Sequence, residues 1–462
     1  MERTTAKKNK YEIDMCNGTI MDKLISFSLP LMLSGILQLM FNAVDIIVVG
    51  RFSGSQALAA VGSTSALINV FTNLFIGISL GANVLTASFY AAGREKEVSE
   101  TVHTAITLAL VSGIVMALVG LVFSRGALAL MGTPDDVIGL SALYMRIYFL
   151  GMPFFMLYNY GAAILRAVGD TKRPLLFLVI AGVINACLNM VLVIVFKLGV
   201  AGVAIATVIS QMISCVLVLR CLCRSESSYR LRFSELGMKG YYLKQIFSVG
   251  VPAGIQSTVI NFSNVLLQSS VNSFGSTAMA GYTAANNLLG FLYVSVNSIT
   301  QACMSFTSQN YGVGKLKRMD RVLADCMILS VVVAVVLGCI CYGFGPEILQ
   351  IYTEDAEVIA CGMEILAYTT ITYFLCGWMD LFPGALRGMG YSAVPMVLSV
   401  IGTVGTRVVW IFGIFPYHRS LAILFISYPA SWIITIILQV VCFYFVRRRV
   451  HRRSQALAGQ EG

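Results

Sequence analysis

The stretch that decides the fold is "LMFNAVDIIVVGRFSG", which runs from Leu39 to Gly54. It is apolar over most of its length, yet it carries an acid, Asp45, near its centre. It belongs to a longer apolar run at 25–50, and roughly 20 such residues are enough to cross a bilayer as a helix. The stretch therefore predicts a membrane-spanning helix with a carboxyl group inside it.

The rest of the chain continues this pattern. Of its 462 residues, 57% are hydrophobic and 12% are charged, whereas a soluble domain has about 45–50% apolar and about 25% charged residues. Lipid cannot satisfy open backbone polar groups, so the spans must be closed helices, and the short alternating segments of a transmembrane β-barrel do not occur. We predict an all-α polytopic membrane protein with about twelve transmembrane helices. The predicted spans are 25–50, 57–90, 102–124, 138–165, 174–196, 200–223, 244–272, 276–310, 322–344, 357–386, 394–415 and 421–446.

The distribution of Lys and Arg predicts the topology. The net charge is +10, but the basic residues gather in the tails and in alternate loops, as they do on the cytoplasmic side of membrane proteins. We therefore expect both termini in the cytoplasm, basic tails beside anionic lipid head groups, and no nucleic-acid partner. The few basic residues assigned to the outer side are Arg51, Arg125, Lys197 and Arg419.

The residues that carry enzyme chemistry form no recognisable set. The twelve cysteines lie mostly in apolar segments and include no CxxC pair, which is typical of small buried hydrophobic residues. With only three scattered histidines, the sequence gives no metal site and no nucleophile triad. We expect no enzyme activity and no cofactor.

The chain contains an internal repeat. A shift of 221 residues superimposes three motifs of the first half on three motifs of the second. Chance matches would not share one offset over more than a hundred residues. The matching pairs are "GSQALAAV" from Gly54 with "GSTAMAGY" from Gly275, "YAAGR" from Tyr90 with "YGVGK" from Tyr311, and "LRAVGDTKRP" from Leu165 with "LRGMGYSAVP" from Leu386.

The repeat predicts two six-helix lobes. An even number of helices gives both lobes the same orientation, so a pseudo-two-fold axis along the membrane normal would relate them, which is a known transporter plan with the site between the halves. The predicted parts are a cytoplasmic tail at 1–20, an N-lobe at 21–223, a cytoplasmic linker at 224–243, a C-lobe at 244–446 and a basic cytoplasmic tail at 447–462.

Small residues and prolines add local predictions. In "GISLG", Gly77 and Gly81 form a small-xxx-small pattern, which allows close helix packing. Prolines inside helices free a carbonyl and bend the helix; such bends can be hinges or static kinks. The prolines in predicted helices are Pro30, Pro153, Pro252 and Pro383.

Polar residues share helix faces in the first half. Gln38, Asn42 and Asp45 are spaced i, i+4 and i+7, which puts them on one face. Asn185 and Asn189 share a face of the fifth helix. We expect these faces to turn away from lipid and to form a polar cage. Further candidates are Thr207 and Ser210 on the sixth helix and Asn159 on the fourth.

Asp45 is the predicted ion-coupling residue. Inserting an acid at mid-helix costs on the order of 2.5–3.5 kcal/mol, and burial favours the neutral form of a carboxyl group. The group can therefore take up and release a proton, and the nearby asparagines can also help to ligate a sodium ion. The alternative is a solvated acid near the outer rim, close to Gly50.

The second half departs from the first. The shift takes Asp45 to Leu266, and the seventh helix carries amides but no acid. Asp380 on the tenth helix is a possible second acid, although it can instead pair with a neighbouring helix. Arg146 and Arg407, also within helices, can neutralise an acid whose identity the sequence does not give.

These residues resemble a known family. "FSLPLMLSGILQLMFNAVDIIVVGRFSGSQALAAVG" from Phe27 is similar to helix 1 and the following loop of bacterial multidrug and toxic compound extrusion (MATE) transporters. "LRAVGDTKRP", "LRGMG" and "GVAGVAIATVIS" resemble that family's loop and helix-6 patterns. The likeness spans roughly 20–450.

The resemblance implies a twelve-helix, two-lobed, V-shaped antiporter. We expect it in the bacterial inner membrane, acting as a monomer. It would export organic, often cationic amphiphilic compounds, driven by inward H+ or Na+. The family's helix-1 acid falls on Asp45, its helix-5 asparagine on Asn185 and its helix-6 threonine on Thr207. Its helix-5 acid falls on Asn189, so this chain lacks one family carboxylate, which leaves the coupling ion and its stoichiometry open.

The substrate site is expected between the lobes, as in other transporters built from two repeats. Aromatic residues on inward helix faces are the candidates, because aromatic faces can hold organic cations. A lipid-linked saccharide flippase of a related fold is the alternative function, and it would favour a strongly cationic cavity. The candidate substrate-cavity residues are Phe41, Tyr158, Asn159, Asn261, Phe262 and Tyr293.

Overall fold

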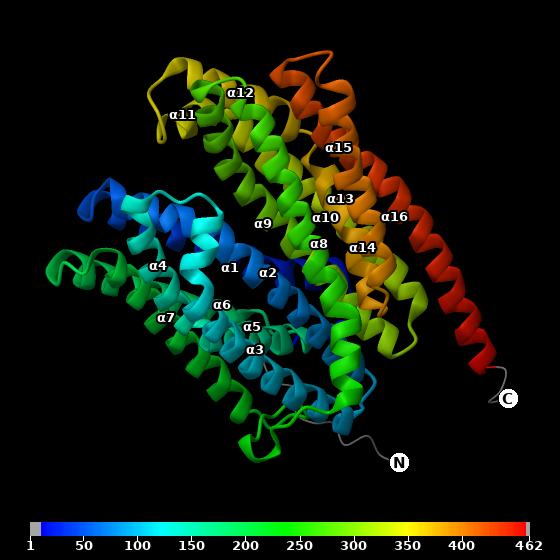
Figure 1. The fold of residues 1–462 in the computed structure, drawn as a ribbon. Helices are drawn as coiled ribbons and strands as arrows, with labels where there is room; N and C mark the ends of the chain where they lie inside the picture. The colour runs from blue at the N-terminus through cyan, green and yellow to red at the C-terminus, as the bar shows by residue number, and fades with distance from the viewer. Residues whose placement is uncertain (1–10, 459–462) are drawn as a thin grey trace. The chain divides into compact units, whose positions relative to one another are not determined.

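The computed structural model describes residues 11–458 and consists of helices joined by short loops (Figure 1). The described chain divides into two compact units. Unit 1 comprises residues up to Ile13 together with Leu33–Gly254, and unit 2 comprises Asp14–Met32 together with Ile255 onward. Helices α1 (Met21–Phe52) and α8 (Gly240–Asn272) each contribute to both units.

Unit 1 is a helical bundle. Helix α3 packs on α4 and α5, α2 packs on α5, and α7 packs on α5 and α6. A π-helical turn, η1, continues α6 directly. The bounds are α2 Ser55–Ala91, α3 Glu95–Leu130, α4 Asp135–Leu150, α5 Met152–Ala167, α6 Lys172–Asn189, η1 Met190–Val195 and α7 Gly199–Cys223, followed by the 3-10 turn η2 Phe233–Glu235.

Unit 2 repeats this arrangement. Helix α13 packs on α9, α10 and α16, just as α5 of unit 1 packs on α2, α3 and α7, so these helix pairs recur at the positions that the 221-residue shift predicts. The bounds are α9 Ser276–Gly312, α10 Leu316–Gly343, α11 Gly345–Gln350, α12 Ala356–Thr369, α13 Tyr373–Gly388, α14 Ala393–Ser399, η3 Val400–Gly405, α15 Thr406–Val409, η4 Trp410–Ile414 and α16 Leu421–Ala458.

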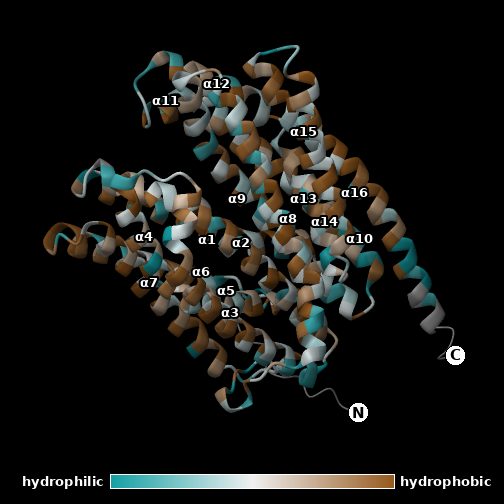
Figure 2. Cartoon of the chain, in the orientation of Figure 1, coloured by the Kyte–Doolittle hydropathy of each residue, from teal (hydrophilic) through white to brown (hydrophobic). Residues whose placement is uncertain are grey.

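The helices are long and apolar enough for a membrane. Within residues 11–458, eight helices are long and apolar enough to cross a membrane. Two bent helix pairs raise the number of spans to ten if each pair counts as one span. Helices α8 and α9, of 33 and 37 residues, are long enough but more polar, and with them the number reaches the predicted twelve. The prediction of an all-α, twelve-helix membrane protein is confirmed, and Figure 2 shows polar residues gathering at loops and at the C-terminal end of α16.

Two spans are broken, which the hydropathy pattern did not reveal. Helices α4 and α5 meet at a 47° bend, and α12 and α13 meet at a 51° bend. Pro153, expected inside a helix, is the second residue of α5 and follows the first bend. Its missing N–H suits the first turn of a helix. Pro30, Pro252 and Pro383 do lie inside helices.

The division into units differs from the predicted lobe limits at 21 and at 223–244. Residues 14–32 belong to unit 2, where backbone carbonyls of Met15 and Asn17 accept hydrogen bonds from Asn310 and Arg318. Residues 224–254 belong to unit 1. In both α1 and α8, the boundary between the units therefore falls two residues after a proline. It follows Met32 in α1, after Pro30, and Gly254 in α8, after Pro252. Of the predicted tails, residues 1–10, with Lys7, Lys8 and Lys10, and residues 459–462 lie outside the described part of the chain.

The glycines of "GISLG" allow α2 to pack closely on the first half of α8. A Cβ atom added at Gly77 would lie 2.3 Å from Cα and N of Gly254. One added at Gly81 would lie 2.2 Å from the carbonyl oxygen of Ile246. Only residues without a side chain fit here, so the predicted close packing is confirmed.

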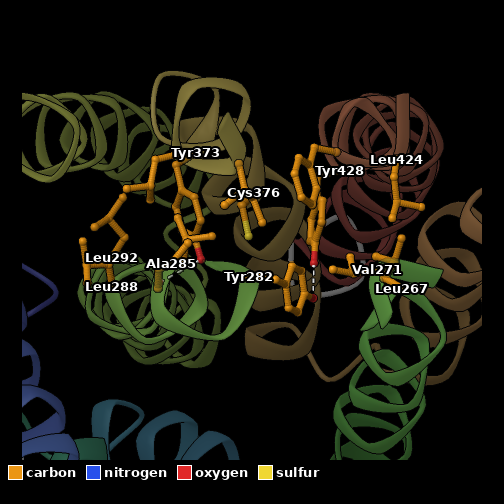
Figure 3. Close-up of a cluster of buried hydrophobic side chains, with 14 of the residues drawn as sticks. Leu267, Val271, Tyr282, Ala285, Leu288, Leu292, Tyr373, Cys376, Leu424 and Tyr428 are labelled. Carbon is orange, nitrogen blue, oxygen red and sulfur yellow. Dashed lines mark hydrogen bonds between the residues drawn. The ribbon is translucent and has the colours of Figure 1, made fainter. Parts of the chain in front are cut away.

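Unit 2 has a large core of buried apolar and aromatic side chains (Figure 3). The hydroxyl groups of Tyr282 on α9 and Tyr428 on α16 form a 2.9 Å hydrogen bond inside it. Trp432 contacts the rings of Tyr373 and Tyr428, with centroid distances of 5.6 and 5.9 Å. The paired hydroxyls let large aromatic residues fill the core without a buried unsatisfied polar group.

We predict that Gly77→Ala lowers the stability of the protein by about 1–3 kcal/mol, because the new methyl group overlaps the backbone of α8. Gly126→Ala is the matched control, since nothing lies within 4 Å of a Cβ atom at that position. Thermal unfolding in detergent measures both. The control should keep or gain stability through its higher helix propensity, and equal midpoints for the two variants would contradict the packing argument.

Candidate functional site

Asp45 lies in α1 and is buried, with 9% of its surface exposed. Its Oδ1 atom accepts a hydrogen bond from Nδ2 of Asn189, at the end of α6. Its Oδ2 atom lies 3.4 Å from the hydroxyl of Thr207 on α7, which donates either to Asp45 or to the carbonyl of Val203. Three helices of unit 1 therefore meet at this carboxyl group.

The hydrogen-bond network extends along α6 and α7. Asn189 Nδ2 also lies 3.1 Å from Oδ1 of Asn185. Asn185 Nδ2 in turn lies 3.5 Å from the hydroxyls of both Thr207 and Ser210. The partners are amides and hydroxyls, and the ion pairs found among the described residues do not include Asp45. The carboxyl group is therefore held by dipoles rather than by a counter-charge.

One acceptor in the network is unused. Oδ1 of Asn189 is buried and has no hydrogen-bond partner within the described residues. It belongs to the amide whose Nδ2 contacts Asp45. Oxygen atoms of carboxylates, amides and hydroxyls are the ligands of hard cations. The arrangement can thus take up a proton on the carboxyl group or hold a small cation among its oxygens.

The backbone of α6 changes at this point. The helix becomes π-helical at Met190, directly after Asn189. Such π-turns are rare and occur frequently at functional sites. Two turns before Asn189 on the same face of α6, the ring of Phe41 fills the space beside Gly182, where a Cβ atom would lie 1.9 Å from it. Phe41 thus packs α1 against α6 instead of standing open to a ligand.

Two of the predicted ion-coupling residues lie apart from this network. Gln38 and Asn42 share the predicted face of α1, but both side chains are exposed, and among the described residues no hydrogen bond joins either of them to Asn185, Asn189 or Thr207. The structure therefore joins four of the six predicted residues through hydrogen bonds. Their roles in ion coupling stay predictions.

Two tyrosines near Asp45 were missed in the sequence. Tyr144 and Tyr148 on α4 lie within electrostatic range of its carboxyl group, and their rings stack with centroids 6.1 Å apart. Tyr144 is 7% exposed. Their i, i+4 spacing is a signal that could have drawn attention to them.

The candidate substrate-cavity residues separate by exposure. Tyr158 is buried and donates to the carbonyl of Pro174 at 3.1 Å, and Asn159 donates to the carbonyl of Phe155 in its own helix at 2.8 Å. In unit 2, Phe262 and Tyr293 are 63% and 45% exposed, and Asn261 is also exposed. The three residues of unit 2 are therefore the more exposed.

Asp380, the possible second acid, is partly buried on α13. It forms no ion pair or hydrogen bond within residues 11–458, although Arg387 lies within electrostatic range. Arg387 instead donates to Oε1 of Gln256 at 2.6 Å. No group of three or more His, Cys, Asp or Glu that could hold a metal occurs in the described part of the chain.

Comparisons with known proteins identify the family. The sequence profile named MatE matches residues 30–191 and again residues 252–412. The two matches begin 222 residues apart, in agreement with the internal repeat. The chain belongs to the MatE family. The resemblance noted in the sequence is thereby confirmed, and this MatE chain is a multi-pass membrane transporter.

Relatives of this MatE protein cover nearly its whole length. It is 32% identical to the "Probable multidrug resistance protein YoeA" of Bacillus subtilis, over 92% of this chain and 93% of the relative. It is 22% identical to the "Multidrug export protein MepA" of Staphylococcus aureus, over 82% and 84%. A solved outward-facing MATE family transporter of the MOP superfamily has the same fold, with a TM-score of 0.87 at 19% identity over 97% and 100% of the two chains.

The contact between Asn189 and Asp45 predicts energetic coupling. Asn189→Leu removes the amide that donates to the buried carboxyl group, which we expect to cost about 1–3 kcal/mol. In an Asp45→Asn background the same change should cost less, giving a coupling of at least about 0.5 kcal/mol in a double-mutant cycle. The measurement is unfolding in detergent at neutral pH.

The control for this cycle is Gln38→Leu, on the same helix but exposed. It should change stability by no more than about 0.5 kcal/mol and should be additive with Asp45→Asn. Additive effects of Asn189→Leu would show that the hydrogen bond carries no coupling.

Proposed function

We propose that the protein is a secondary active antiporter that exports organic, cationic amphiphilic compounds, driven by inward H+ or Na+ through alternating access. The observation that supports this most is the buried carboxyl group of Asp45. It has amide and hydroxyl partners and no basic partner among the described residues.

The coupling step follows from the electrostatics of Asp45. An ionised carboxylate is costly to bury, and the hydrogen bonds from Asn189 and Thr207 offset only part of that cost. Uptake of a cation from the outside removes the net charge. A driving ion shifts a conformational equilibrium only by its difference in affinity between the states, so the carboxyl group must bind its ion more tightly in one state than in the other.

Both H+ and Na+ are compatible with the network. A proton needs only the carboxyl group, whose neutral form still accepts from Asn189 or donates to it. Sodium would use the oxygens of Asp45 and Thr207 and the unpaired Oδ1 of Asn189. Because Asn189 stands where the family has an acid, we propose that a single carboxyl group, and thus one coupled charge, operates in this unit.

The substrate class rests on two supports. The relatives YoeA and MepA are named for multidrug resistance and multidrug export. The exposed aromatic rings of Phe262 and Tyr293 offer faces to organic cations. The positive-inside pattern supports an inner-membrane protein with both termini cytoplasmic, and we propose that it works as a monomer in the lipid bilayer.

The test is efflux of a fluorescent organic cation from proteoliposomes, with H+ and Na+ gradients imposed separately. The wild type should transport with one of them. Gradient-independent leakage would identify a channel, and the absence of efflux together with movement of a lipid-linked saccharide would favour the flippase alternative.

Asp45→Asn should abolish gradient-driven export while the protein still folds, because asparagine preserves the hydrogen-bonding shape but neither takes up a proton nor carries a charge. Asp136→Asn is the matched control, since it makes the same chemical change at an exposed residue of α4 in the same unit. Normal export by a well-expressed Asp45→Asn protein would sink the proposed mechanism.

A further inference from the structure

Unit 2 contains a second buried charge, and it is basic. Arg407 lies in the four-residue helix α15, between the π-helical segments η3 and η4. Only 3% of its surface is exposed. A charged side chain inside a membrane bundle is costly and is normally paired. The groups that surround Arg407 therefore decide what it can bind.

The protein satisfies only one end of this guanidinium. Nη1 of Arg407 donates to Oγ of Ser263 at 3.3 Å and to Oδ1 of Asn264 at 2.8 Å, both on α8. Its Cζ atom lies 4.7 Å from the ring centroid of Tyr428. Nε is buried and has no partner among the described residues, and no hydrogen bond from Nη2 to them is found. The ion pairs of the described chain do not include Arg407.

Another arginine, Arg447, shows the kind of partner that the free edge of Arg407 lacks. Arg447 uses Nε and Nη2 to bind the two oxygens of Asp320, at 2.7 and 2.5 Å. These two donors form the edge of a guanidinium that matches a carboxylate with two parallel hydrogen bonds. The same edge of Arg407 has no acceptor from residues 11–458.

No acid of the described residues forms an ion pair with Arg407, although Asp380 lies one turn along α13 from Cys376. The side chains within electrostatic range of Arg407 include Tyr428, Cys376, Tyr282 and Tyr373, which are uncharged members of the core in Figure 3. The ring of Tyr428 lies against the guanidinium. Because Nη1 is already occupied, the edge formed by Nε and Nη2 is left for an anion.

The internal repeat relates this place to the Asp45 network. The 221-residue shift takes Thr207, which contacts Asp45, to Tyr428, which contacts Arg407. It takes Asn42 to Ser263, and it takes η1 to residues 411–416, which overlap η4. Corresponding helices therefore build both clusters, each beside a π-helical segment, but the buried charge has the opposite sign.

We propose that the Nε–Nη2 edge of Arg407 binds the carboxylate group of an organic ligand. A planar carboxylate fits this edge with two hydrogen bonds, and the apolar and aromatic neighbours suit an organic body attached to it. The site belongs to unit 2 alone and does not depend on the antiport mechanism.

Benzoate is the probe. The purified full-length protein in detergent is titrated with sodium benzoate, and unfolding is followed by tryptophan fluorescence. All three tryptophans of the chain, Trp378, Trp410 and Trp432, lie in unit 2. A ligand of the native state raises the unfolding midpoint. We expect a saturable rise with benzoate, and none with its neutral analogue benzamide or with sodium chloride at the same ionic strength.

Variants assign the effect to the guanidinium. Arg407→Gln should abolish the rise, and Arg407→Lys, which keeps the charge but loses the two-donor edge, should weaken the apparent affinity at least about tenfold. Arg387→Gln is the matched control, because Arg387 is half-buried and its Nε also lacks a partner among the described residues, but its Nη2 donates to Gln256, so the two-donor edge is not free.

The outcomes decide the proposal. A benzoate effect lost in both Arg407 variants and kept in Arg387→Gln supports it, and the lysine variant serves alone if Arg407→Gln does not fold. The proposal is overturned by no rise in the wild type, by an equal rise with benzamide or chloride, or by an unchanged affinity in Arg407→Lys. Loss of the effect in Arg387→Gln alone would assign the anion to Arg387.

Discussion

A charge placed among apolar helices must find its partners inside the protein, because lipid offers none. This constraint organises both units. In unit 1, Asp45 on α1 accepts hydrogen bonds from Asn189 of α6 and Thr207 of α7, which connect the three helices. In unit 2, Arg407 is met by Ser263 and Asn264 of α8. Neither charge is neutralised by an opposite charge of the described chain. Each is stabilised by hydrogen bonds with amides or hydroxyls, and our proposals assign a mobile ion to the first charge and a carboxylate ligand to the second.

The repeat supplies the same helices twice, and small sequence changes give the two copies different chemistry. The helix pairs of unit 1 recur in unit 2, and so does the π-helical segment beside the buried charge. The acid of α1 has become Leu266 in α8, and the basic residue has appeared on the partner helix instead. A duplicated scaffold therefore holds an acid in one unit and an arginine in the other, and arginine does not lose its proton in proteins.

The residues that carry this chemistry were visible in the sequence to different degrees. Asp45 stood out because an acid is rare in an apolar run, and Asn185, Asn189 and Thr207 came from polar spacing and from the family resemblance. Tyr144 and Tyr148 were missed, because tyrosine is common in membrane helices near the interface and does not stand out from their composition as an acid does. Gln38 and Asn42 share a helix face with Asp45, but of the three only Asp45 is hydrogen-bonded to α6 and α7. Helix periodicity gives the shared face and not the helix that packs against each turn of it. The unpaired edge of Arg407 could not be predicted, since its partners are more than a hundred residues away.

The sequence by itself determined the membrane environment, the approximate helix limits, the duplication and the family. These follow from hydropathy and from matching motifs, which are local or repeated along the chain. The bends between α4 and α5 and between α12 and α13, the change of unit within α1 and α8, and the partners of each buried charge were decided only by the tertiary structure. The reason is physical: a span needs only its own apolar length to enter lipid, whereas a hydrogen bond needs two groups within about 3 Å, and the folding of distant segments brings them there.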